Sequence, residues 1–342
     1  MGKFLTELKE AFREGEVHRR MRDFEDSSSK STSQSSDTDT HDHAQTVDRY
    51  YDVSTGLMVL GWGESLHFAP LTPHESLEES KIRHQRLMIS KLELQEDMFV
   101  ADIGCGIGGP MRRVVRESGV RMVGININEL QLERAKRLIA EAGLDDKVDF
   151  QQCSFMDMSH INDSTFDRGY AIESTCHAPD RLQAYKEIFR VLKPGALFWG
   201  QEMCMTDIFD PKDTQHIAIK RALMKGIALK DIVSFGEVNQ ALESAGFEVI
   251  EGMDRDQQEE PSTPWYQPMQ NRQGTLGSFL RRVPLGRKAI FAGLKLAEVF
   301  KQFPRGSAEV VRFLDETAEA YVAGGESGLF TPLYCFLARK PQ

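Results

Sequence analysis

The fold is decided by one stretch of the chain, Val100-Ala101-Asp102-Ile103-Gly104-Cys105-Gly106-Ile107-Gly108-Gly109-Pro110. It places a glycine-rich turn between a short apolar run and a segment that can form a helix. Glycine is needed in such a turn because the backbone takes dihedral angles that other residues resist, and because a Cβ atom would keep a ligand away from the main chain. The stretch therefore predicts a strand, a turn and a helix, with a nucleotide-like ligand lying on the backbone of the turn.

Two classes of enzyme bind a ligand on a turn of this kind. Gly104, Gly106 and Gly109 fit the G-x-G-x-x-G pattern of dinucleotide-binding oxidoreductases, and methyltransferases bind S-adenosylmethionine (SAM) on a similar glycine-rich turn. A dinucleotide site has a carboxylate roughly 20 residues further on, at the end of the second strand, where this chain has Asn126. The acidic residue Asp102 instead directly precedes the glycines, where it can orient their amides or bind an ammonium group. We therefore favour a methyltransferase; an oxidoreductase, or a turn that binds no ligand, stays open.

Composition argues against several classes of protein. The chain of 342 residues is 40% hydrophobic, so it can hold one large domain or two modest ones around a sizeable core. Its formal net charge of −10, without a dominant cluster of Lys and Arg, argues against DNA or RNA as a partner. The five cysteines are scattered without metal-ligand spacing and predict reduced thiols and no metal site. The sequence contains no signal peptide and no apolar run of membrane-spanning length, so we expect a cytoplasmic protein.

The N-terminal residues differ in composition from the rest. Residues 26–40 consist almost entirely of Ser, Thr and Asp, have little to bury and are expected to be disordered. Residues 1–6 fit an N-myristoylation pattern, and four apolar side chains can line one face of a helix: Phe4, Leu5, Leu8 and Phe12. Because so short a pattern often arises by chance, we favour an amphipathic tail helix over a lipidated anchor. We expect three parts: a tail at 1–46, a SAM-binding core at 47–253 and a C-terminal region at 254–342.

Strand-like and helix-like segments alternate along the core. The runs predicted as strands are 99–103, 122–125, 148–151, 166–172, 196–201 and 247–250. After an excursion rich in proline and aromatic residues, and then apolar helical runs, the chain returns to a strand at 333–338. This order predicts an α/β fold with a doubly wound, mostly parallel sheet that the late strand joins. We expect the excursion to form a helical cover over the strand ends where ligands bind, or simply to complete the core.

Several further segments carry family information. The most specific are Gly61-Trp62-Gly63-Glu64-Ser65-Leu66-His67-Phe68 and Tyr170-Ala171-Ile172-Glu173-Ser174-Thr175-Cys176-His177-Ala178-Pro179-Asp180. Others are Tyr50-Tyr51-Asp52, Val191-Leu192-Lys193-Pro194-Gly195, Glu202-Met203-Cys204-Met205-Thr206-Asp207, Pro264-Trp265-Tyr266 and Gly328-Leu329-Phe330-Thr331-Pro332. Together they resemble the sterol 24-C-methyltransferases, a branch of the class I SAM-dependent methyltransferases, from about Tyr50 to the C-terminus. The resemblance implies a Rossmann-like fold, SAM as methyl donor and, as substrate, a sterol with an isolated side-chain double bond.

The resemblance also implies which residues bind the cofactor. They are Tyr51, Asp102, Gly104, Gly106, Asn126, Gln131, Ser154 and Phe155. Asp102 and the two glycines would lie at the methionine end of SAM, Asn126 and Gln131 near its ribose, and the last two residues beside its adenine. Glu173 and His177 follow the fourth strand. The resemblance places both residues beside the sulfonium and the substrate double bond.

The implied reaction explains why certain catalytic residue types are needed. An alkene is a weak nucleophile, so the protein must align it with the methyl group and exclude water. Methyl transfer leaves a carbocation, which an aromatic face can stabilise and a weak base must quench by taking a proton. Trp62, Phe68 and Tyr170 can supply faces, and Glu173 or His177 can accept the proton. Core packing for the aromatic residues, and a helix-start role for the carboxylate, are the alternatives.

The chain departs from the family pattern at three places. Residues 57–60 are apolar where the family usually has aromatic and acidic residues, Ser154 replaces an aspartate, and Ala222 and Met224 stand where acids are expected. The Ser154 change weakens one expected contact with the adenine but leaves backbone groups to make it. The other two changes favour a more apolar isoprenoid, or one held without a hydroxyl anchor. Transfer to a phenol or amine, and a SAM-binding or lipid-binding regulator without activity, are the competing hypotheses. The expected partner is a small apolar lipid; contact with a membrane such as the endoplasmic reticulum, and assembly into a homo-oligomer, are left open.

Overall fold

The computed structural model describes residues 55, 58–59, 62–258, 263–270, 284–300, 302 and 305–342. The chain divides into two compact units. The first, which we call the sheet unit, comprises Glu64–Phe209, Asp231–Pro264 and Gly328–Gln342; the second, the helical unit, comprises Met1–Gly63, Asp210–Lys230 and Trp265–Ser327. The predicted tail and Tyr51 lie outside the described residues, and the predicted domain limits stay predictions.

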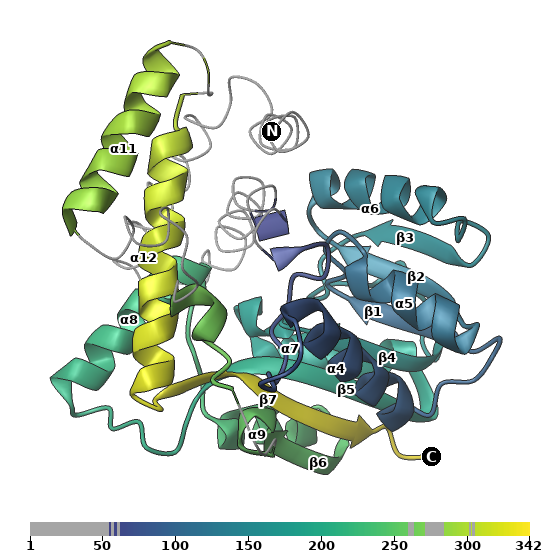
Figure 1. Cartoon of the computed structure of the whole chain (residues 1–342). Helices are drawn as coiled ribbons and strands as arrows, with labels where there is room; N and C mark the ends of the chain where they lie inside the picture. The colour runs from purple at the N-terminus through teal and green to yellow at the C-terminus, as the bar shows by residue number, and fades with distance from the viewer. Residues whose placement is uncertain are drawn as a thin grey trace. The chain divides into compact units, whose positions relative to one another are not determined.

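The sheet unit contains one seven-stranded sheet in the order β3-β2-β1-β4-β5-β7-β6 (Figure 1). Its strands are β1 (Phe99–Ile103), β2 (Arg121–Asn126), β3 (Val148–Gln152), β4 (Phe166–Ile172), β5 (Leu192–Met205), β6 (Glu248–Asp254) and β7 (Phe330–Arg339). The first five strands pair in parallel, whereas β7 lies antiparallel between β5 and β6. The predicted doubly wound, mostly parallel sheet with a late returning strand is confirmed. Strand order reverses between β1 and β4, and ligands of such sheets bind at the strand ends beside this reversal.

One strand starts earlier than its apolar run suggested. Helix α7 (Arg181–Val191) ends at Val191, and the next residue, Leu192, is already extended and pairs with Phe166. The pairing register then shifts before Leu197 is reached, which accommodates Pro194 at the start of the strand. The Lys193-Pro194-Gly195 segment, which follows the end of α7, therefore belongs to β5.

Helices cover both faces of the sheet. On one face lie α4 (Leu77–Lys91), α5 (Gly109–Ser118) and α6 (Glu129–Glu141), and on the other lie α7 and α9 (Phe235–Ser244). Successive strand residues point to opposite faces. Val100 therefore packs in the apolar cluster beneath α4, α5 and α6, and Ala101 in the cluster beneath α7 and α9. Helix α9 begins with a capping box, in which the Ser234 hydroxyl accepts from the Glu237 N–H and the Glu237 carboxylate accepts from the Ser234 N–H.

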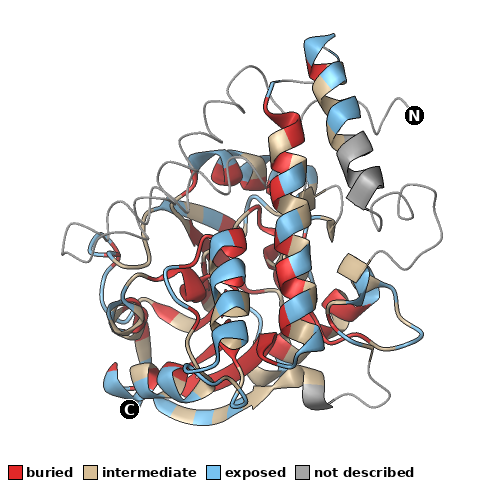
Figure 2. Cartoon of the chain, turned by 90° about the vertical axis from the view of Figure 1, so that its left-hand side faces the viewer, coloured by how far each residue is buried: buried red, intermediate tan, exposed pale blue. Residues whose placement is uncertain are grey.

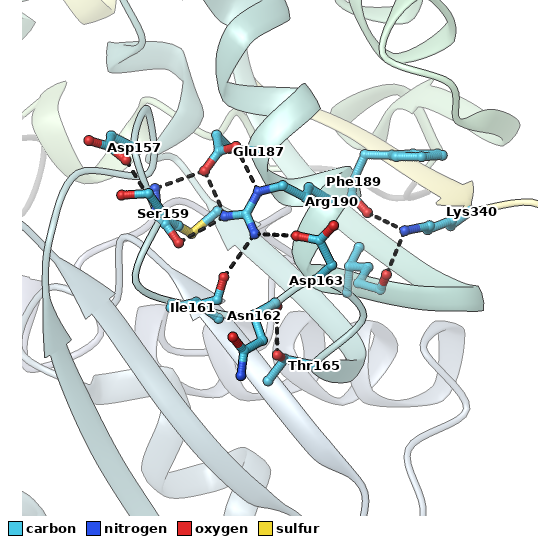
Figure 3. Close-up of polar contacts among 12 residues, drawn as sticks. Asp157, Ser159, Ile161, Asn162, Asp163, Thr165, Glu187, Phe189, Arg190 and Lys340 are labelled. Atoms are coloured by element: carbon cyan, nitrogen blue, oxygen red, sulfur yellow. Dashed lines mark hydrogen bonds and ion pairs between the residues drawn. The ribbon is translucent and has the colours of Figure 1, made fainter.

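An arginine fixes the loop that follows β3 (Figure 3). The Arg190 guanidinium, on α7, donates to both carboxylate oxygens of Glu187, each at 2.9 Å, and to the carbonyl oxygens of Met158 and Ile161, each at 2.8 Å. The Met158 N–H donates to Glu187 at 2.8 Å. A planar guanidinium suits this two-pronged geometry. The clamp orders the chain shortly after Ser154 and Phe155.

The helical unit packs around one long helix. Its described elements are α8 (Thr214–Ile227), the 3₁₀ turn η3 (Gln267–Gln270), α11 (Pro284–Val299) and α12 (Ser307–Glu326). Buried residues recur along α12 at helical spacing, as Figure 2 shows. Gly226 of α8 lets α8 and α12 approach closely, because a Cβ there would lie 2.9 Å from the hydroxyl of Thr317 on α12. Within the described residues, no helix is both long enough and apolar enough to span a bilayer.

Candidate active site

The glycine turn between β1 and α5 has three glycines with positive φ: Gly104, Gly106 and Gly108, the last of which is the N-cap of α5. Gly104 has a φ of 82°, and a Cβ there would lie 2.3 Å from the Cβ of Ser174. Gly106 has a φ of 55°, and apart from its two chain neighbours no described residue has a heavy atom within 4 Å of the position that its Cβ would occupy. Gly104 thus admits the segment after β4, while Gly106 leaves open space against bare backbone. Gly109 has a third role, because its Cβ would collide with the Glu64 carbonyl oxygen at 2.2 Å.

Asp102 lies at the end of β1, directly below this turn, and is 3% exposed. It pairs in register with Tyr170 of β4, whose hydroxyl donates to its carboxylate at 2.7 Å. Burial raises the pKa of Asp102 to about 7, against the lowering effect of the Tyr170 hydrogen bond. Among the described residues no Lys, Arg or His forms an ion pair with it.

The predicted ribose and adenine residues lie at the ends of β2 and β3. The Asn126 side chain donates to Gln131 at 2.9 Å, and its carbonyl oxygen accepts from the Ile127 N–H at 2.9 Å, so the structure brings the two predicted ribose residues together. The Ser154 hydroxyl accepts from the Met156 N–H at 3.1 Å, and Phe155 is half-buried against the core. Their contacts with a cofactor stay predictions.

Glu173 follows β4 with a φ of 52° and is 8% exposed. Its Oε1 accepts from the Phe68 N–H at 2.6 Å and from the Gln201 amide at 2.8 Å, while its own N–H donates to the Gln201 carbonyl at 2.9 Å. Burial raises the pKa of Glu173 to about 8, and the Phe68 N–H opposes that shift. The next residue, Ser174, donates its hydroxyl to the Ile103 carbonyl, which holds Glu173 beside the glycine turn.

A buried polar network surrounds this carboxyl. The His84 ring lies 2.9 Å from the side-chain amide oxygen of Gln201 (Oε1). The His67 ring lies 2.7 Å from the Phe68 backbone carbonyl oxygen and 2.8 Å from the Gln85 side-chain amide. Burial lowers the pKa of His67 to about 4 and that of His84 to about 3, so both rings are neutral near pH 7. The sequence interpretation missed Gln201 and His84. The signal that was available is the polar pair Gln201-Glu202 inside an otherwise apolar strand.

A second buried network supports the 3₁₀ turn η1 (Thr175–His177). The Glu202 carboxylate accepts from the hydroxyls of Thr175 and Tyr185, the latter at 3.0 Å, and lies 3.7 Å from the Arg181 guanidinium. Breaking a buried ion pair leaves an uncompensated charge, so removal of either Arg181 or Glu202 is expected to destabilise the segment around η1. His177 lies buried at the end of η1.

The remaining predicted residues fall in different surroundings. Phe68 is buried, and its backbone joins the Glu173 network, whereas the Tyr170 ring is fully buried in the core on the α4 and α5 face. Trp62 is half-buried and belongs to the helical unit. The catalytic roles of Trp62, Phe68, Tyr170, Glu173 and His177 stay predictions. No group of three or more His, Cys, Asp or Glu within the described ranges could hold a metal ion.

The fold and the glycine turn with its preceding acid define a class I SAM-dependent methyltransferase. Comparisons with known proteins narrow the class. Residues 38–274 match the family described as mycolic acid cyclopropane synthetase, and residues 278–342 match the sterol methyltransferase C-terminal family. The chain is 44% identical to a cycloartenol-C-24-methyltransferase of Arabidopsis thaliana, over 86% of this chain and 87% of that protein. It is 38% identical to a sterol 24-C-methyltransferase of Eremothecium gossypii, over 88% and 82% respectively.

Among solved structures, the fold is similar to that of a geranyl diphosphate C-methyltransferase from Streptomyces coelicolor in complex with S-adenosyl-L-homocysteine. The TM-score is 0.61 at 17% identity, covering 88% of this chain and 98% of that one. The chain belongs to the sterol 24-C-methyltransferase family. The resemblance seen in the sequence is thereby confirmed, and the oxidoreductase alternative is set aside.

Proposed function

We propose that the protein transfers the methyl group of SAM to an isolated side-chain double bond of a sterol or a closely related isoprenoid. One observation carries the proposal beyond family membership. Two buried carboxyls lie on the neighbouring strands β1 and β4: Asp102 at the end of β1, before the glycine turn, and Glu173 directly after β4, next to Ser174, which bonds to the start of that turn. One suits an ammonium group, and the other suits a developing positive charge.

The residues of the turn fit SAM. Gly106 leaves bare backbone beside open space, and Asp102 is a buried acid with no described cationic partner. We infer that Asp102 binds the ammonium group of SAM and that Asn126, Gln131, Ser154 and Phe155 line the rest of the cofactor. SAM supplies an electrophilic methyl group, and the protein must align it with the alkene and keep water out.

Glu173 acts after the carbon–carbon bond has formed. The positive charge then left on the substrate is stabilised by a carboxylate, and a proton on an adjacent carbon must pass to a base to restore a neutral product. Glu173 is our first candidate for this base, and His177 of η1 is the second. The faces of Phe68, Tyr170 and Trp62 are the candidate cation-stabilising surfaces.

The names of the relatives, and the apolar departures at residues 57–60, Ala222 and Met224, favour a sterol or apolar isoprenoid over a phenol or amine. Peripheral contact with a membrane, and a homo-oligomer, stay predictions. Vesicle sedimentation and light scattering would test them separately.

The test is incubation of purified protein with methyl-labelled SAM and a panel of sterols, linear triterpenes, tocopherol precursors and amines. We expect label in a sterol that carries a side-chain double bond and none in the same sterol with a saturated side chain. Label confined to a phenol or an amine would contradict the proposal. SAM binding without any labelled product would favour a regulator instead.

A further inference from the structure

Gln201 lies in the middle of β5 with its side chain fully buried, and the sheet register places it beside Ile172 and Cys335. Three oxygen atoms surround its amide nitrogen: Glu173 Oε1 at 2.8 Å, the Pro332 carbonyl at 3.0 Å and the Phe68 carbonyl at 3.2 Å. These acceptors allow one orientation of the amide only, because the reversed amide would turn its own oxygen toward three others. The nitrogen therefore faces Glu173.

His84 secures the same orientation from the opposite end of the amide. Its Nε2 lies 2.9 Å from Gln201 Oε1, and its ring contacts the ring of Trp199 edge-on at a centroid distance of 5.5 Å. A neutral imidazole that donates from Nε2 satisfies the Gln201 oxygen without bringing a charge close to Glu173. Helix α4 and strand β5 are thus joined through one oriented amide.

These contacts make the two carboxyl oxygens of Glu173 different. Both hydrogen bonds recorded for this carboxyl among the described residues, from Phe68 and Gln201, reach Oε1. We propose that Gln201 is a positioning residue for the reaction: with the Phe68 N–H it holds Oε1 of Glu173 inward, so that Oε2 is the oxygen presented to the reacting substrate. This inference rests on the proposed function, because it concerns how Glu173 performs its part.

Loss of the Gln201 donor changes the charge of Glu173 as well as its orientation. Two N–H donors on one oxygen favour the ionised carboxyl, whereas burial favours the neutral acid. The titratable groups around Glu173 are His67 before α4, His84 on α4, Cys176 on η1 and Cys335 on β7; His177 closes η1, and Arg255 acts on His84 and Cys335. Burial lowers the pKa of both network histidines and raises the pKa of both thiols, so these four groups stay neutral near pH 7.

The experiment compares the pH dependence of kcat, at saturating SAM and sterol, for the parent protein, Gln201→Met and Asn239→Leu. Methionine keeps the unbranched shape of glutamine without its donor. Asn239 is the matched control, because its amide oxygen accepts a hydrogen bond from the Tyr334 hydroxyl of β7 at 2.7 Å, which the variant also loses, and no hydrogen bond joins it to Glu173 among the described residues. We expect Gln201→Met to move the acid limb of kcat upward by roughly 1–2 pH units, the effect of losing one hydrogen bond to a charged group. Asn239→Leu should leave the limb in place.

A uniform loss of kcat with an unmoved limb in Gln201→Met would overturn the inference, because a merely structural residue, or a limb that belongs to His177, gives that result. If Gln201→Met does not fold, His84→Phe keeps the ring against Trp199 while releasing the Gln201 oxygen, and a shift of the limb in the same direction is expected. An unmoved limb in His84→Phe would count equally against the inference.

A direct titration separates failure of this inference from failure of the proposed function. With carbon-13 in the glutamate carboxyls, the resonance that disappears in Glu173→Gln belongs to Glu173. Its midpoint in the protein without SAM should lie near pH 8 and move higher in Gln201→Met. If the parent methylates no sterol, the proposed function fails while this measurement still stands. An unchanged midpoint overturns the inference in either case.

Discussion

Asp102 and Glu173 are both buried carboxyls at the ends of neighbouring strands, yet the protein holds them differently. Asp102 accepts one hydrogen bond, from the Tyr170 hydroxyl, whereas Glu173 accepts two on a single oxygen, from the Phe68 N–H and Gln201. Burial raises the pKa of Asp102 to about 7 and that of Glu173 to about 8. The first group has no described cationic partner, which suits the binding role that we propose for it. The second is oriented before any ligand arrives, which suits a chemical step.

The largest effect should come from Glu173→Gln. An amide keeps the shape and can still accept from Phe68 and Gln201, but it loses the charge and the basicity. We expect turnover to fall by about 10²–10⁴ while SAM affinity changes little, because the lost interaction forms only as charge develops. A side-by-side assay of SAM affinity and single-turnover rate checks this. Unchanged turnover would pass the role of base to His177.

Asp102→Ala should lower SAM affinity, whereas Glu173→Gln should lower turnover. The charge-assisted bond to an ammonium group contributes roughly 1.5–3 kcal/mol, so affinity should fall about 10-fold to 100-fold. Ser154→Ala is the matched control, because its neutral hydroxyl is worth about 1 kcal/mol, or about 5-fold. Calorimetric titration of both variants measures the difference. Equal affinities for Asp102→Ala and the parent would remove Asp102 from the cofactor site.

Of the two carboxyls, only the surroundings of Asp102 could be predicted from the sequence, because the residues that form them are neighbours in the chain. Asp102 and the glycines are contiguous, and glycine in the left-handed region leaves a recognisable pattern, so the β1 turn and its acid were found without the structure. The apolar runs and the capping box at Ser234 are local in the same sense. Where a strand starts in an irregular way, as β5 does at Leu192, the apolar pattern placed its beginning four residues too late.

The Glu173 network could not be read from the sequence, because its members are far apart in the chain. Phe68 is 105 residues from Glu173, and His84 is 117 residues from Gln201. Their meeting depends on how α4 packs on the sheet and on β7 returning beside β5, and neither leaves a spacing signal. A buried glutamine in an apolar strand indicates a partner but does not say which one.

The free energy of unfolding should reveal the raised pKa values. A carboxyl whose folded pKa lies above its ordinary value, 3.8 for Asp102 and 4.5 for Glu173, holds a proton that the unfolded chain has released. Stability from these groups therefore falls as pH rises, up to about 7 and about 8. His67 and His84, with pKa values lowered from 6.5, add the opposite slope below pH 6.5. Above pH 6.5, of these four groups only the two carboxyls still change the free energy of unfolding with pH.

We therefore expect the protein without SAM to lose on the order of 1–2 kcal/mol of stability through Glu173 between pH 6.5 and about 8. Urea unfolding of the parent and Glu173→Gln at the two pH values measures it, since all other titrating groups are shared. The glutamine variant should lose less stability across this window. Parallel behaviour of the two proteins would mean that Glu173 is ionised throughout it.

The smallest effect, and the sharpest test of the Asp102 side, should come from Tyr170→Phe. The change removes the one described donor to Asp102 and leaves the buried ring in place. Since that hydrogen bond lowers the pKa of Asp102, the variant's carboxyl should be more fully protonated near pH 7 and should release more of a proton when SAM binds. Affinity should weaken by about 5-fold, the value of one ordinary hydrogen bond. Calorimetry in two buffers of different ionisation enthalpy measures the proton released.

Tyr185→Phe is the control, because that tyrosine is equally buried but donates to Glu202, so its proton release should match the parent. If Tyr170→Phe also matched the parent at pH 7, Asp102 would already be ionised without a cation, and its contrast with Glu173 would disappear.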